Sequence, residues 1–193
     1  MSAQPKSLDF YPFIVDLDQM NELMGGFGWR SATSEEIPVL VELGERLIND
    51  RLADAPTIER VHNATKISAW AYGDPIEGLV LCVPLSEAGL TALQANEFQP
   101  GNPADQHIAA AGETCAGCYI GIYAGSTYEA RKAVMTGAGV IRMGIFSQVP
   151  CFARAATEDG ARSMESLGLA PAGFGPDKLW MQGALSAPTR KVA

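Results

Sequence analysis

The sequence is short of the features that mark nucleic-acid-binding and membrane proteins. Basic residues are in deficit: 14 Lys and Arg stand against 22 Asp and Glu, which gives a formal net charge of −8. A nucleic acid or an anionic membrane requires a basic face, so neither is an expected partner. The longest apolar run, 79–85, contains Pro84 and is too short to span a bilayer. The N-terminal residues lack the apolar core of a signal peptide, and we expect a cytoplasmic protein.

Metal-binding and redox-active residues are also scarce. The chain has two histidines and four cysteines, and only Cys115 and Cys118 have the CxxC spacing. A structural zinc site needs about four ligands, usually in two pairs, and a redox CxxC begins a helix, whereas this pair precedes a predicted strand. We therefore predict no metal, reduced thiols, and Cys82 and Cys151 as small core residues. A metal- or thiol-dependent protein that uses Cys115 and Cys118 is the alternative.

Length and apolar content fit one folded unit. The 193 residues, 47% of them hydrophobic, suit a single domain over 1–193 that can bury a full core without staples. We expect the ends, 1–8 and 186–193, to be flexible. Residues 95–114 have no sustained hydrophobic period and carry two prolines, which predicts a long loop.

Hydrophobic periodicity and turn residues predict alternating helices and strands. Thr33 and Glu36 fit a capping box before an apolar stripe, which predicts a helix over 35–52. Strands at 67–72 and 79–83 flank turn residues and should form a hairpin. The other predictions are an extended segment (10–17), a glycine-rich loop (24–30), a short helix (57–65), a helical stretch capped by Ser86, a strand (118–123), a helix (127–148) capped by Ser126 or Thr127, a strand (151–156), a helix (157–168) and two strands (170–174, 178–183). This order predicts an α/β fold with a mixed central sheet and flanking helices (β-α-α-β-β-β-α-β-α-β-β).

One segment resembles a known family. ARAATEDGARSMESLGLAPAG (153–173) looks like the fifth strand, fourth helix and following strand of the GNAT acyltransferases, with Ala161, Glu165, Leu167 and Gly168 at family positions. The predicted element order agrees. The resemblance implies a GNAT fold and an enzyme that moves an acyl group from acyl-CoA, in the first instance acetyl-CoA, to a primary amine of a small molecule or peptide. Dimers are common in that family, so a homodimer is an open option.

The resemblance also suggests where acyl-CoA binds. In the family, pantetheine lies along the fourth strand and pyrophosphate sits on the N-terminus of the next helix, where free N–H groups favour anions. Two turns fit, at 136–139 and at 125–127. We prefer the second, because it leaves a crossover helix of about six turns. Gly137 and Gly139 are then inside the helix at a cost of roughly 1 kcal/mol each, tolerable where a helix packs closely on a sheet. The cofactor-binding candidates are therefore Ile122, Tyr123, Ala124, Gly125, Ser126 and Thr127.

Several residues that the family uses are missing. Met164 stands where many members place a proton-donating Tyr, and Glu158 or Asp159 stands for the Asn at the helix start. Ile122 in the preferred register, or Val134 in the other, replaces the Gln or Arg of the phosphate turn. A catalytically silent GNAT-fold module for ligand binding or interaction is therefore an alternative.

Substitute groups can be named from the sequence. Glu113, near the fourth strand, is the candidate to take the proton of the amine, directly or through water. Tyr128 or Ser126 could protonate the leaving thiolate. Phe27 and Trp29, in the glycine-rich segment, are the candidates for an acceptor pocket.

Overall fold

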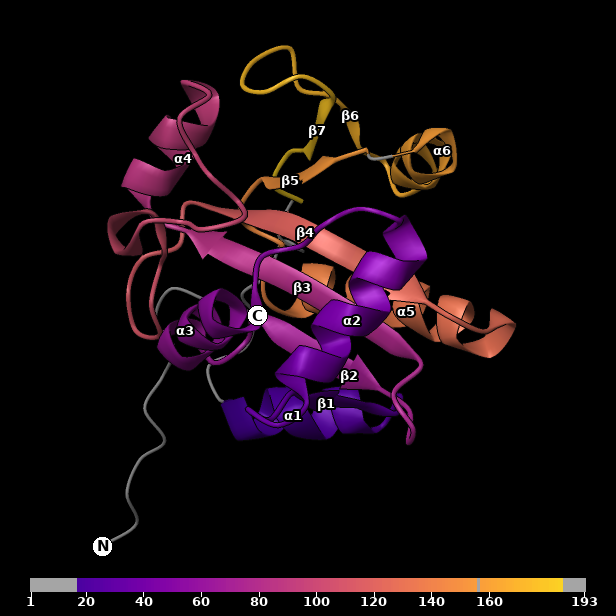
Figure 1. Cartoon of the computed structure of the whole chain (residues 1–193). Coiled ribbons are helices and arrows are strands. Elements are labelled where there is room, and N and C mark those ends of the chain that lie inside the picture. Colours follow the sequence, from indigo (N-terminus) through magenta and orange to yellow (C-terminus); the bar gives the residue numbers. More distant parts are fainter. Residues whose placement is uncertain (1–16, 156, 186–193) are drawn as a thin grey trace, which may run out of the picture.

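The computed structural model describes residues 17–155 and 157–185, whose strands form one seven-stranded sheet (Figure 1). The sheet order is β1-β2-β3-β4-β5-β7-β6. The elements are α1 (Leu17–Gly25), β1 (Trp29–Ser31), α2 (Ile37–Ile48), α3 (Ala55–Thr65), β2 (Ala69–Tyr72), β3 (Gly78–Leu85), α4 (Glu87–Gln94), the 3₁₀ turn η1 (Asp105–His107), β4 (Gly117–Gly125), α5 (Tyr128–Gly144), β5 (Cys151–Arg154), α6 (Glu158–Ser166), β6 (Ala170–Pro171) and β7 (Leu179–Gln182). The predicted mixed α/β sheet with flanking helices is confirmed.

The sheet changes direction at one place. β1 to β4 are antiparallel neighbours, as are β5, β7 and β6, whereas β4 and β5 are parallel. A parallel pair needs a crossover, and α5 supplies it between the two strands. The predicted hairpin of β2 and β3 is confirmed.

Helices cover both faces of the sheet. Figure 1 shows α2 and α3 in front of the sheet and α5 behind it. On the α5 side the core includes Met20 and Met24 of α1, Trp29, Trp70 and Val134. On the other side, apolar residues of α2 and α3 pack against β2, β3 and β4. The apolar stripe predicted for the first long helix is therefore its buried face.

Capping residues explain where most helices begin. Ser86, Thr127 and Thr157 each accept a hydrogen bond from the backbone N–H three residues later, at 3.0, 3.1 and 3.0 Å. Asp54 caps α3 in the same way, and Pro56 occupies a first-turn position that needs no N–H donor. Helix α3 thus begins at the Ala55-Pro56 pair, two residues before the predicted start of the short helix.

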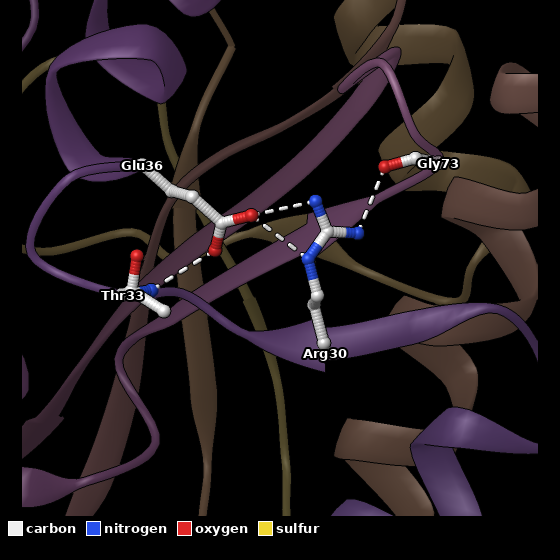
Figure 2. A network of polar contacts seen from close by, with 4 residues as sticks. All are labelled: Arg30, Thr33, Glu36 and Gly73. Carbon is white, nitrogen blue, oxygen red and sulfur yellow. Dashed lines mark hydrogen bonds and ion pairs between the residues drawn. The ribbon is translucent and has the colours of Figure 1, made fainter.

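The segment before α2 differs from the prediction. Residues 24–30 were predicted as a loop, but α1 runs to Gly25 and Trp29 begins an edge strand. Arg30 of β1 connects the start of α2 and the turn after β2 (Figure 2). Its Nε and Nη2 donate to Glu36 Oε1 at 2.8 and 2.6 Å, and its Nη1 donates to the carbonyl of Gly73 at 2.8 Å. The other Glu36 oxygen accepts from the Thr33 N–H at 3.0 Å, which is half of the predicted capping box. Of the extended segment 10–17, only Leu17 lies within the described residues, and it begins α1.

Candidate functional site

The parallel strands β4 and β5 separate halfway along β4. Their pairing covers only Cys118 to Ile120 of β4 and Cys151 to Ala153 of β5. Beyond this point β4 continues to Gly125 with β3 beside it on one edge. A cavity of about 490 Å³ opens at the other edge, which we call the strand cleft.

The strand cleft collects residues from the elements around the split. Its walls are the end of α2, the second half of β4, the first turns of α5, the end of β5 and one side of α6. The lining residues are Leu47, Ile48, Ile120, Gly121, Ile122, Tyr123, Ala124, Gly125, Arg131, Val134, Met135, Ala153, Arg154, Thr157, Asp159, Gly160, Ser163 and Met164. Of the predicted cofactor-binding residues, the structure thus brings Ile122, Tyr123, Ala124 and Gly125 to this cavity.

A second cavity, of about 310 Å³, adjoins the cleft, and we call it the loop pocket. Its walls come from α3, β3, the segment after α2, and the predicted long loop, which contributes Pro100, Gly101 and Pro103. The two cavities share Ile48, Gly121, Ile122 and Arg154. A ligand in one cavity can therefore meet a ligand in the other beside Gly121.

Gly121 is the extra residue of a β-bulge. Leu81 pairs with Ile122 and Cys82 pairs with Ile120, so β3 has no partner for Gly121. A bulge leaves the backbone of its extra residue unpaired in the ladder. The junction of the two cavities is thus formed by exposed backbone with no side chain over it.

The turn into α5 is tight. A Cβ on Gly125 would lie 2.6 Å from both the carbonyl carbon of Ala130 and the nitrogen of Arg131, so the glycine is required by packing against α5. Ser126 donates to the Glu77 carbonyl at 3.1 Å, and Thr127 is the helix cap. Both residues stand at the helix start, just beyond those that line the cleft.

The alternative phosphate turn at 136–139 is inside α5. A Cβ on Gly137 would meet the Trp29 ring at 2.6 Å, which is the close helix-to-sheet packing expected for a glycine there. Gly139 has no atom within 4 Å of such a Cβ. The preferred helix register is therefore confirmed at its start, although α5 ends at Gly144, earlier than 148.

The predicted proton-transfer residues lie away from both cavities. Glu113 is exposed in the loop before β4, at the far end of the strand from the cleft, where its carboxylate accepts from the Ala110 N–H at 3.0 Å. Tyr128 is 63% exposed, and its ring contacts the Lys132 ammonium, 4.5 Å from the ring centroid. The structure does not bring either residue to the cleft.

The predicted acceptor-pocket aromatics also lie elsewhere. Trp29 is 2% exposed and is buried under α5, where its Nε1 donates to the carbonyl of Ala133 at 3.1 Å. Phe27 lies in the turn between α1 and β1 and is 46% exposed. Neither residue lines the strand cleft or the loop pocket.

Two arginines in the cavities were not predicted from the sequence, and Tyr123, predicted only as a cofactor-binding residue, brings a hydroxyl to the cleft. The Tyr123 hydroxyl donates to Ser163 Oγ of α6 at 3.4 Å, so it bridges β4 and α6 beside Met164. Arg131 and Arg154 add positive charge. A signal existed for Arg154, because it ends a strand at the carboxyl edge, where ligands bind in open α/β sheets.

The four cysteines are free and buried. Cys118 and Cys151 are register partners on β4 and β5. Burial raises the pKa of Cys115 to about 12 and raises the pKa of Cys118 well above its usual range. Cys115, which precedes the strand, is thus buried like Cys118. Within residues 17–155 and 157–185, no group of three or more His, Cys, Asp and Glu side chains could hold a metal ion.

Comparison with a solved structure supports the fold. No protein-family model and no curated protein sequence matches this chain. Ard1 from Thermoplasma volcanium superposes with a TM-score of 0.51 at 12% identity, over 82% of this chain and 97% of that one. A structure from Corynebacterium glutamicum described as "histone acetyltransferase HPA2 and related acetyltransferase" superposes with a TM-score of 0.49 at 16% identity. The superposition covers 83% of this chain and 97% of that one.

The element order, the split between β4 and β5 and the likeness to Ard1 together define the fold class. The chain has the GNAT fold, as its sequence predicted. At 12% identity the likeness concerns the fold alone. None of the helices in the described part of the chain is long and apolar enough to cross a membrane.

Proposed function

We propose that this protein is an acyl-CoA-dependent N-acyltransferase that moves an acyl group, in the first instance acetyl, to a primary amine. The observation that carries the proposal is the strand cleft, which meets the loop pocket at the Gly121 bulge. A thioester donor and an amine acceptor need two cavities that meet at the reacting carbon. We further propose that the enzyme is cytoplasmic, is a monomer or a homodimer, and acts on a small-molecule or peptide amine.

The second half of β4 offers a track for pantetheine. From Gly121 to Gly125 the edge of the strand that faces the cleft has no strand beside it in the described structure. Its backbone N–H and C=O groups can pair with the two amides of pantetheine as another strand would. The pyrophosphate would then reach Arg131 and the first turn of α5, where the helix dipole favours an anion.

The reacting carbonyl would lie at Gly121. A bulge displaces the backbone of its extra residue from the regular ladder, and we assign the Gly121 N–H to donate to the thioester oxygen and to the negative charge that develops on it during attack. The neutral amine nitrogen attacks the carbonyl carbon, a C–N bond forms and the C–S bond breaks. The nitrogen loses a proton to solvent or a base, and the thiolate of CoA takes up one proton. The products are an amide and free CoA.

Tyr123 is the proposed proton donor to the thiolate. Its hydroxyl stands in the cleft wall against Ser163, one residue from Met164, the position where the resembled family carries a Tyr. The geometry favours Tyr123 over Tyr128, which is outside the cleft. It likewise gives Glu113 no direct path to the amine.

Calorimetric titration of acetyl-CoA and longer acyl-CoAs into the full chain tests the proposal. We expect micromolar binding, a free energy of about −8 kcal/mol. Arg131→Glu should weaken binding at least tenfold by repelling the phosphates. Lys132→Glu is the matched control. It makes the same change of charge one residue away, and Lys132 lines neither cavity. Gly125 is a poor site for this test, because any side chain there clashes with α5.

The outcomes separate cleanly. If no acyl-CoA binds, the acyltransferase proposal fails. If both charge reversals weaken binding equally, Arg131 does not hold the phosphates and the orientation of acyl-CoA is wrong.

A further inference from the structure

The loop pocket indicates the chemical class of the acceptor. We propose that the acceptor is a free α-amino acid with an apolar side chain, whose carboxylate is bound by Arg154 while its amine faces the thioester at Gly121. This inference rests on the proposed acyl transfer and adds the substrate class to it.

The pocket has the size and cover of a small-molecule site. Its volume of about 310 Å³ is at the lower end for ligand pockets. The loop that covers it is anchored by Arg60 of α3, which pairs with the Asp105 carboxylate and donates to Asn102 Oδ1 at 3.2 Å and to the Pro103 carbonyl at 2.8 Å. Because this loop is held in place over a small cavity, the pocket suits a free metabolite rather than a segment of a folded protein.

Most of the pocket surface is apolar. Ile58 and Val61 of α3 face Leu81 and Val83 of β3 across it. These branched side chains bind an aliphatic or aromatic group by removing it from water. They offer no partner to a long polar or polycationic chain, whose desolvation would be uncompensated.

The charge of the pocket opposes that of the whole chain. Arg51 and Arg154 line it, and Asp50 is the one carboxylate among its described lining residues, so its formal charge is positive in a protein of net charge −8. Arg154 makes no ion pair with any residue of the described structure. The guanidinium of Arg154 lies close enough to the buried hydroxyl of Tyr119 to act on it. Burial raises the pKa of Tyr119, and the positive charge of Arg154 opposes that rise. Such a guanidinium is free to bind an anion.

The position of Arg154 selects the α-amino acid. Arg154 and Gly121 both belong to the lining that the two cavities share. The amine must reach Gly121 and the anion must reach Arg154 from the same small molecule. An α-amino acid carries both groups on one carbon, and its side chain can then enter the apolar part of the pocket. A bidentate guanidinium–carboxylate pair fixes that orientation.

The test compares L-leucine with two analogues that lack its carboxylate and with a polyamine. Full-length protein is incubated with acetyl-CoA and L-leucine, L-leucinamide, isoamylamine or spermidine, and CoA release and the mass of the acetylated product are measured. We expect kcat/KM for L-leucine to exceed that for L-leucinamide and isoamylamine at least tenfold. Leucinamide makes the comparison stringent, because its less basic amine is more often neutral and ready to attack.

Arg154→Gln isolates the proposed contact. It should raise the KM for L-leucine at least tenfold and leave the KM for isoamylamine and the calorimetric Kd of acetyl-CoA unchanged. Arg46→Gln is the control, because Arg46 is exposed on α2 and lines neither cavity.

Each other outcome overturns a defined part. Equal or faster turnover of L-leucinamide, isoamylamine or spermidine, or acetyl-CoA binding with no turnover of L-leucine, rejects the proposed acceptor class and leaves the cofactor proposal standing. An Arg154→Gln defect in acetyl-CoA binding rather than in the leucine KM assigns the arginine to the donor. No acyl-CoA binding rejects both proposals.

Discussion

At the scale of single residues, the strand cleft contains Met164, which stands where the resembled family has a Tyr, and close to it the hydroxyl of Tyr123. Met164 cannot donate a proton, yet the Tyr123 hydroxyl reaches Ser163 on the same helix from the opposite wall of the cleft. A proton donor can thus stand on the strand rather than on the helix and still face the same space. What matters for catalysis is the position of the hydroxyl, not the element that carries it.

We predict that Tyr123→Phe lowers kcat about 100-fold or more, because a positioned acid contributes about 100- to 10,000-fold when the leaving group gains charge. The Kd of acetyl-CoA should change little, since the phenyl ring remains. Tyr128→Phe is the control and should keep full kcat. Steady-state kinetics with the best acceptor measures kcat, and calorimetry measures the Kd of acetyl-CoA. A low kcat for Tyr128→Phe beside a normal kcat for Tyr123→Phe would show that Tyr128 is the proton donor.

Some site residues can be predicted from local sequence patterns, whereas others depend on contacts between distant parts of the chain. Residues 122–125 were predicted because strand and helix signals placed them before a crossover helix. Glu113 and Trp29 were predicted to act at the site, and the structure places them elsewhere, because their positions depend on which end of β4 opens and on what α5 covers. Those are contacts distant in sequence, and no local pattern encodes them.

At the scale of elements, helix α5 shows what close packing requires. Gly137 lies against the buried Trp29 ring, whereas Gly139, two residues away, faces open space. Both are mid-helix glycines with the same intrinsic cost. Only one of them has a reason in the packing of helix on sheet.

These two glycines form a matched pair for a stability experiment. Gly139→Ala should stabilise the protein by about 0.5–1 kcal/mol, since alanine is the better helix former. Gly137→Ala should destabilise it by about 1–3 kcal/mol, because a Cβ 2.6 Å from a buried ring forces overpacking. Urea unfolding measures both. Stabilisation by both substitutions would mean that α5 does not press on Trp29.

The elements that the sequence predicted well have local signals. The starts of α4, α5 and α6 follow from capping residues, and the β2–β3 hairpin follows from its turn. Edge strand β1 has only three residues, and its extended form depends on pairing with β2, which a glycine-rich stretch does not reveal. β6 is also short, with two residues where five were predicted.

At the scale of the whole molecule, one buried histidine ties α3 to the sheet. The Nδ1 of His62 accepts from the Ala69 N–H of β2 at 3.1 Å, so its Nε2 carries the proton and can donate to Ser31 Oγ of β1, also at 3.1 Å. The ring is 7% exposed. Protonation would place a hydrogen on Nδ1, break the bond to β2 and leave a charge under α3.

His62 therefore sets a pH dependence of folding. Burial, followed by the charge of Lys66, lowers its pKa in the folded protein below the unfolded value of about 6.5. Between the two values the unfolded chain binds more protons, so the free energy of unfolding falls as the pH drops below about 6.5, by at most about 1.4 kcal/mol per pH unit. The loss stops once the pH is below the folded pKa.

Urea unfolding at pH 7.5, 6.5 and 5.5 measures this effect. His62→Gln should be less stable at pH 7.5, because it loses a fitted ring, but its stability should be flatter across this range. His107→Gln removes the other histidine of the chain and is measured beside it as the matched substitution. A His62→Gln protein with the same slope as the wild type would show that another group carries the pH dependence, and that protonation of His62 does not release α3 from the sheet.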